Sequence, residues 1–189
     1  MDNCGNYMIV TYPEKIQPLI DYLSSLTARP DMAVLRDHML QAEVSSAEMG
    51  DFVQFNDAGY RRNMVFENEV VELLCLCWKS GQRSPIHDHA TSVCGVKIIA
   101  GTGTETVYEM TPSGYIKAIK SEDFSCGQVL VSEDSDTHQV ANLQSIDQNL
   151  VTLHIYSPPL RSMKTWSIDS RKTRIYEPVN EGHMDGCGI

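Results

Sequence analysis

Basic residues are scarce in this sequence: 15 Lys and Arg stand against 25 Asp and Glu, which gives a formal net charge of −10. Nucleic acids and anionic membranes attract basic protein surfaces, so we expect neither as a partner. The sequence also lacks an uninterrupted apolar run of about 18 residues, the length that indicates a transmembrane helix. Its first residues lack the basic and apolar regions of a signal peptide, so we expect a cytoplasmic protein.

Cysteine pairs of the form Cys-X-X-Cys are also missing, although the chain holds 6 cysteines. Their absence argues against a zinc ribbon and against a thioredoxin-like redox motif. Cys75 and Cys77 alternate along an apolar segment that has the composition of a strand. Buried free cysteines usually behave as small hydrophobic side chains, so we expect these two in the core.

The first part of the chain has the pattern of helices. Within residues 1–55, apolar residues recur at steps of three and four, which predicts amphipathic helices. Asp31 is placed to cap a second helix. Ser45 and Glu48 have the spacing of a capping box that would open a third.

The rest of the chain has the pattern of strands. Residues 60–160 contain short apolar segments separated by Pro, Gly and other turn residues. Many short strands at regular spacing favour a sandwich or a small barrel. We therefore expect a mainly β protein with a helical N-terminal segment, formed as one domain over residues 1–189, with a loose tail at 182–189.

Three histidines are candidate metal ligands. His87 and His89 are two positions apart, so on a strand both imidazoles would point to the same side. His138 lies on another predicted strand and can complete the site from across a barrel. Imidazole binds zinc, copper, iron and nickel, so the ligand type alone does not select the metal.

Glycines at fixed distances surround these histidines. The order Gly-X5-His-X-His-X4-Cys-X6-Gly runs from Gly81 to Gly101, and Gly127 and Asn142 flank His138. This spacing resembles the two motifs of the cupin superfamily, whose fold is a small β-barrel or jelly roll. Cys94 stands where the general cupin pattern has a glutamate ligand, which leaves three neutral histidines and no carboxylate.

Over residues 60–159 the sequence resembles the cysteine dioxygenase family. The matching segments are Tyr60-Arg61-Arg62-Asn63, Leu76-Cys77-Trp78, Ile86-His87-Asp88-His89, Cys94, His138 and Thr152-Leu153-His154-Ile155-Tyr156-Ser157-Pro158-Pro159. This resemblance implies that the three histidines bind ferrous iron. It also implies that Arg62 binds a substrate carboxylate and that Tyr60 lines the same pocket. A guanidinium is suited to that role because its planar fork can hold a carboxylate through two hydrogen bonds.

Alternating residues of one predicted strand carry further implied roles. Thr152, His154 and Tyr156 share one face of that strand. The family has a hydrogen-bonded relay of serine, histidine and tyrosine at these positions, with threonine replacing the serine here. Ser157–Pro158 matches a family position with a cis peptide bond.

Cys94 matches a cysteine that is joined covalently to the active-site tyrosine in animal members of the family. Many bacterial relatives have glycine there, and this chain carries both residues as Cys94-Gly95. A thioether between Cys94 and Tyr156 and a free Cys94 thiol are both consistent with the sequence.

The function implied by the resemblance is oxygenation of L-cysteine by O2 to cysteine sulfinic acid, with Fe(II) as cofactor and a monomer as the expected state. Two alternatives stay open. One is dioxygenation of 3-mercaptopropionate or another small thiol, although relatives with that preference usually have glutamine in place of Arg62. The other is a non-oxidative metal-binding cupin, an isomerase or a sensor, although such proteins usually keep the glutamate ligand.

Overall fold

The computed structural model describes residues 11–133 and 137–182. Two short α-helices and two 3-10 turns precede eleven strands within these residues. The helical elements are η1 (Glu14–Ile16), α1 (Gln17–Ser25), α2 (Met32–Gln41) and η2 (Gly50–Phe52). The strands are β1 (Arg61–Glu67), β2 (Glu72–Trp78), β3 (Ile86–His87), β4 (Val93–Ala100), β5 (Thr102–Met110), β6 (Ile116–Ser125), β7 (Val129–Glu133), β8 (Thr137–Ala141), β9 (Leu150–Ser157), β10 (Met163–Ser167) and β11 (Ser170–Tyr176). The predicted loose tail at 182–189 lies outside the described residues except for Gly182.

The helical elements begin where the sequence predicts them. The Asp31 carboxylate accepts hydrogen bonds from the backbone N–H groups of Ala33 and Val34, which confirms it as the N-cap of α2. Ser45 and Glu48 exchange the two reciprocal bonds of a capping box. The element that follows is a turn leading into η2, so the predicted third helix is a single 3-10 turn.

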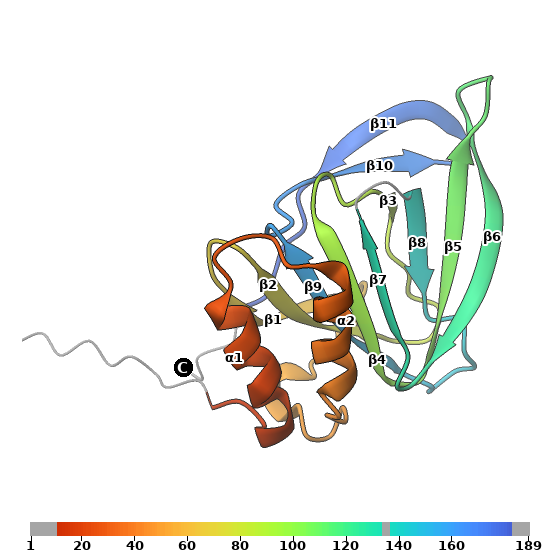
Figure 1. The fold of residues 1–189 in the computed structure, drawn as a ribbon. Helices are drawn as coiled ribbons and strands as arrows, with labels where there is room; N and C mark the ends of the chain where they lie inside the picture. Colours follow the sequence, from red (N-terminus) through yellow and green to blue (C-terminus); the bar gives the residue numbers. More distant parts are fainter. Residues whose placement is uncertain (1–10, 134–136, 183–189) are drawn as a thin grey trace, which may run out of the picture.

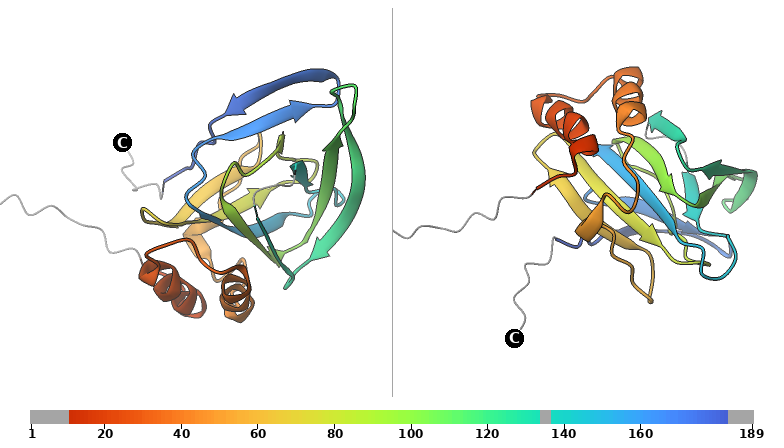
Figure 2. Two further views of the ribbon diagram at one scale, coloured as in Figure 1. Left: turned by 45° about the horizontal axis from the view of Figure 1, so that its top comes forward. Right: turned by 90° about the horizontal axis from the view of Figure 1, so that it is seen from below.

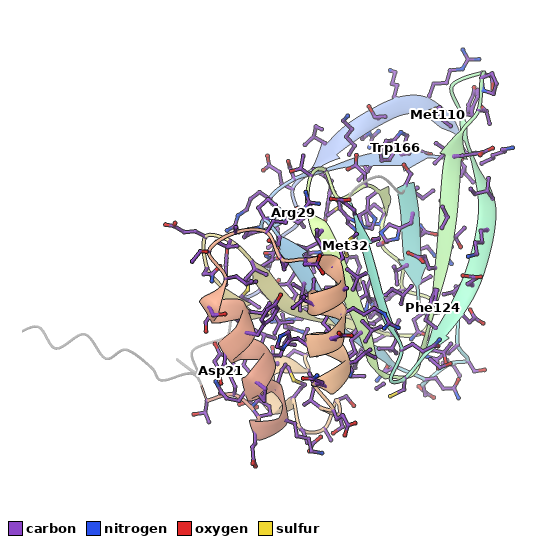
Figure 3. The ribbon with its side chains drawn as sticks, viewed as in Figure 1. Asp21, Arg29, Met32, Met110, Phe124 and Trp166 are labelled. Carbon is purple, nitrogen blue, oxygen red and sulfur yellow. The ribbon has the colours of Figure 1, made fainter. Side chains whose placement is uncertain are left out.

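The strands form two sheets that face each other. One sheet has the order β1-β2-β9-β4-β7, and the other has the order β11-β10-β3-β8-β5-β6. Both helices cover the outer face of the first sheet, as Figure 1 and the two further views in Figure 2 show. Side chains from both sheets meet in the space between them (Figure 3), where they form an apolar core inside the barrel. This is the mainly β cupin barrel that the sequence predicts, with its helices at the N-terminus.

Strands β2 and β9 are buried on both faces because one face meets the helices and the other lines the barrel. On β2, Leu73, Cys75 and Cys77 belong to the core shared with the helices, whereas Leu74, Leu76 and Trp78 belong to the core inside the barrel. The expectation that Cys75 and Cys77 are core residues is therefore confirmed. Side chains alternate along a strand, so every second residue of β9 also points into the barrel.

Two strands extend the barrel beyond residue 160, where the sequence pattern is polar. β10 pairs with β3 on one side and with β11 on the other. After β11 the chain returns to β1, where Glu181 accepts a hydrogen bond from the Met64 N–H and donates one to the Arg62 carbonyl. The C-terminal part of the described chain thus pairs with β1 next to Arg62.

No helix within the described residues is long and apolar enough to cross a membrane.

Candidate metal centre and active site

The three predicted histidine ligands come together inside the barrel. One ring nitrogen from each of His87, His89 and His138 lies within 4.8 Å of the other two, and all three side chains are buried. His87 is the last residue of β3, and His89 lies just after the strand rather than on it. His138 on β8 is the direct cross-strand partner of His87, so it completes the cluster from the neighbouring strand. The expectation that it would reach the site from across the barrel was wrong.

Hydrogen bonds on the outer nitrogens orient two of these rings. The His87 Nδ1–H donates to the Pro85 carbonyl at 2.9 Å, and the His138 Nδ1–H donates to the Glu105 carboxylate at 2.5 Å. A neutral ring that donates through Nδ1 has Nε2 free of a proton and able to bind a metal ion. Such bonds fix the tautomer of metal-binding histidines in proteins.

The spacing of the inner nitrogens fits a bound ion. The Nε2 atoms of His89 and His138 are 3.0 Å apart. Two nitrogens that bind one ion at about 2.1 Å, as in zinc sites, lie about 3 Å apart when they subtend a right angle at it. The donor set of three imidazoles fits zinc, copper, iron or nickel.

Burial keeps the imidazoles of His87 and His89 neutral, which is the form that binds metals. Burial, together with the neighbouring His138, lowers the pKa of His87 to about 3. Burial also lowers the pKa of His89 well below its ordinary value, and nearby His138 and His87 act in the same direction.

A small cavity adjoins the three histidines. Arg62 in β1 and Tyr60, just before that strand, line it together with Trp78, His154 and Tyr156. Arg62 is only 5% exposed, and its guanidinium carbon lies 5.5 Å from the centre of the Tyr156 ring. The Tyr60 ring stacks on Trp78 with centroids 4.2 Å apart. The structure thus brings a buried, permanently charged group to the same cavity as the candidate ligands.

The inward-facing residues of β9 form a continuous hydrogen-bonded chain. His154 lies between two hydroxyls, with Nδ1 3.1 Å from the Tyr156 oxygen and Nε2 2.9 Å from the Thr152 oxygen. The Trp78 indole N–H donates to Thr152 at 3.1 Å. An indole can only donate, so the Thr152 hydroxyl is left to bond His154 with its proton or its remaining lone pair.

Cys94 is buried beside this chain of hydrogen bonds. It is the direct cross-strand partner of Tyr156 between β4 and β9. Burial raises the pKa of its thiol above the ordinary range. Opposite residues of paired strands have Cβ atoms about 5 Å apart, which brings the thiol close to the tyrosine ring. The Ser157–Pro158 peptide bond at the end of β9 is cis, as the sequence predicts.

Several groups that contact the site were not predicted from the sequence. Glu105 holds His138, and Trp78 extends the hydrogen-bonded chain to Thr152. Glu72 and Asn180 surround Arg62. Trp78 was part of the matching segments without an assigned role, whereas the other three lie outside those segments.

A family model described as cysteine dioxygenase type I matches residues 8–169. The chain belongs to the cysteine dioxygenase type I family. This is a family of thiol dioxygenases, and the chain has a three-histidine site of the kind expected for it.

Two curated relatives of this chain are vertebrate proteins. Cysteine dioxygenase type 1 of Rattus norvegicus is 31% identical over 153 residues, which cover 78% of this chain and 76% of the relative. The Danio rerio protein of the same name is 29% identical, with 83% of this chain and 81% of the relative covered.

Solved structures with a similar fold are more distant. A conserved protein with a double-stranded β-helix domain from Klebsiella pneumoniae has a TM-score of 0.48 and 14% identity, and covers 62% of this chain and 92% of its own. An RmlC-like cupin from Methanocaldococcus jannaschii has a TM-score of 0.43 and 15% identity, and covers 56% of this chain and 87% of its own.

Proposed function

We propose that this protein is an iron-dependent dioxygenase that converts L-cysteine and O2 to cysteine sulfinic acid. The observation that carries the proposal is the position of Arg62, which lines the same cavity as the three histidines. A buried guanidinium there suits a small substrate that carries a carboxylate as well as a group for the metal.

The metal in this proposal is ferrous iron held by His87, His89 and His138. A ferrous ion bound there would supply the redox chemistry that activates dioxygen toward the substrate sulfur. The ligand set is neutral, so it leaves the positive charge of the ion uncompensated and favours an anionic thiolate as substrate.

The protein's own side chains would orient the substrate. Arg62 would pair with the substrate carboxylate, and Tyr60 would form the wall beside it. Tyr156, whose hydroxyl is held by His154, would donate a hydrogen bond into the cavity, while Thr152 fixes the other side of the His154 ring. Both atoms of O2 add to the cysteine sulfur, which supplies all four electrons, so the reaction needs no external reductant.

The pairing of Cys94 with Tyr156 makes a thioether between them feasible. Its formation would join Sγ to the ring carbon and remove one hydrogen from each residue, with dioxygen as the oxidant. The mass of the intact protein distinguishes the two states, because the linked form lacks two hydrogens. Cys94→Ser would abolish the difference.

The first alternative substrate is 3-mercaptopropionate, which has the carboxylate and thiol but no amine. Oxygen uptake by the iron-loaded protein with each thiol tests the choice between them. We expect a higher kcat/KM with L-cysteine than with 3-mercaptopropionate. We expect the Arg62→Gln variant to have a lower kcat/KM for L-cysteine and to retain more of its activity with 3-mercaptopropionate. A higher value with 3-mercaptopropionate would overturn cysteine as the substrate.

The second alternative is a non-oxidative metal-binding cupin. Cys94 argues against this alternative, because Cys94 takes the position of the glutamate ligand that such proteins usually keep. Absence of oxygen consumption with both thiols, in protein shown to contain iron, would favour this alternative.

A further inference from the structure

A buried carboxylate lies near the proposed substrate-binding arginine without a direct hydrogen bond to it. Glu72 is 0% exposed, and its Oε1 lies 3.7 Å from Nη2 of Arg62. This distance is an ion pair but is too long for a hydrogen bond. Among the described residues, Nη2 of Arg62 is buried without a hydrogen-bond partner.

Asn180 separates the two charged groups. Its Oδ1 accepts a hydrogen bond from the Arg62 Nε–H at 2.8 Å, and its Nδ2–H donates to Oε2 of Glu72 at 2.9 Å. The other Glu72 oxygen accepts from the Leu160 backbone N–H at 3.0 Å. Arginine can only donate and an ionised carboxylate can only accept, so an asparagine amide matches both neighbours in one orientation.

The chain holds Asn180 in place through its backbone. The adjacent residue, Glu181, pairs with β1 through hydrogen bonds to Arg62 and Met64. These backbone bonds hold the segment in place without the Asn180 amide. Asn180 itself lies beyond residue 169, where the family match ends.

A guanidinium and a carboxylate normally form a close bidentate pair. Such a pair between Arg62 and Glu72 would occupy the Nη groups that a substrate carboxylate needs. With Asn180 between them, the Arg62 Nε–H bonds to the Asn180 amide instead of Glu72, and the Nη groups of Arg62 are left without a direct hydrogen bond to Glu72.

We propose that Asn180 is a positioning residue that keeps Arg62 available to the substrate, so that Asn180 and Glu72 together set the preference for thiols that carry a carboxylate. This inference rests on the proposed role of Arg62 in carboxylate binding. It does not depend on whether the bound thiol is then oxygenated.

Anaerobic calorimetric titration of the iron-loaded protein tests the inference, because it measures binding without turnover. The two ligands are L-cysteine and cysteamine, which is cysteine without its carboxylate. In Asn180→Ala we expect Arg62 to close onto Glu72, which raises the Kd for L-cysteine about tenfold, the size of one charge-assisted hydrogen bond. The Kd for cysteamine should stay within about twofold, because that ligand does not use Arg62.

A second substitution separates positioning from general disruption. Asn180→Ala combined with Glu72→Gln removes the competing charge, so we expect it to restore most of the L-cysteine affinity. Glu177→Ala, in the same segment and exposed, is the matched control and should leave both Kd values unchanged. If Asn180→Ala folds poorly, Asn180→Asp retains the size of the side chain, places a carboxylate against Arg62 and should weaken L-cysteine selectively.

The inference is overturned if Asn180→Ala changes both Kd values alike or neither of them, or if Glu72→Gln does not restore L-cysteine affinity. A wild-type protein that binds both ligands equally well would also overturn it. If the expected differences in Kd are found but the iron-loaded wild type takes up no oxygen with L-cysteine, the proposed dioxygenation is contradicted and the role of Asn180 is not.

Discussion

At the scale of single residues, the hydroxyl of Thr152 joins the Trp78 indole to the His154 ring. It accepts a hydrogen bond from the Trp78 N–H and forms another with Nε2 of His154. Thr152→Val keeps the shape and removes both bonds. A buried polar group without a partner costs about 1–3 kcal/mol, so we expect the free energy of unfolding in urea to fall by at least about 2 kcal/mol.

The same substitution should slow turnover, because His154 would no longer be held beside the Tyr156 hydroxyl. Loss of such a supporting bond typically lowers activity about tenfold or more, which steady-state kcat measures. Thr152→Ser is the matched control, since it keeps the hydroxyl, and should stay within about twofold of wild type. Equal losses in the two variants would show that the hydroxyl has no such role.

Glu72 gives the protein a pH dependence that can be measured separately. Burial raises the pKa of its carboxyl, against the opposing effects of the Leu160 N–H and the charges of Arg62 and Arg161. A carboxyl with a higher pKa in the folded state binds its proton more tightly there, so its contribution to stability increases as pH falls through that pKa.

Glu72→Gln removes this titration. We therefore expect the Tm of wild type to rise relative to that of the variant as pH falls from neutral toward the ordinary glutamate pKa of about 4.3. Thermal unfolding of both proteins across this range measures the difference. A difference that is constant or changes in the opposite direction would contradict a raised pKa.

The contacts of single residues also show how far the site could be predicted. His87 and His89 are two positions apart, and a spacing rule identifies such a pair directly. Arg62 and Asn180 are 118 positions apart. No local pattern of charge or hydrophobicity connects residues at that distance, because their contact depends on how the C-terminal segment returns to β1.

At the scale of elements, the packing of α2 on β4 depends on the absence of a side chain at Gly95. A Cβ there would lie 2.6 Å from the Met39 sulfur and 3.4 Å from Cδ2 of Leu35. Overpacking a core typically costs about 1–3 kcal/mol. Methionine is flexible and can move in part, so we expect Gly95→Ala to lower the free energy of unfolding by about 1 kcal/mol.

Gly59→Ala is the control, because a Cβ at Gly59 has no heavy atom within 4 Å. Chemical denaturation should show a change within about 0.5 kcal/mol for this variant. If both alanine variants have the same stability, the contact between α2 and β4 is looser than the structure indicates.

Elements with strong patterns were predictable, and those with weak patterns were not. The two-faced burial of β2 and β9 gives them mostly apolar segments, which indicate strands directly. β11 is exposed along nearly its whole length, so its sequence carries no alternation to recognise. The strand expected to carry both His87 and His89 ends at His87, where the Asp88 carboxylate instead accepts a hydrogen bond from the backbone N–H of Lys164 in β10.

At the scale of the whole molecule, the formal charge of −10 opposes self-association. We expect a monomer of 21.2 kDa in sedimentation velocity at physiological salt. A stable species of twice that mass would contradict this expectation and would require a search for the interface.

Oxygenation of cysteine in the three-histidine cavity can be tested on the product itself. The most direct test incubates the ferrous-loaded protein with L-cysteine under ¹⁸O2 and analyses the product by mass spectrometry, with His138→Ala and metal-free protein as controls. We expect cysteine sulfinic acid that carries two labelled oxygens, formed by the iron-loaded wild type alone. Oxygen consumption no higher than that of the metal-free protein, or a product without both labels, would contradict it.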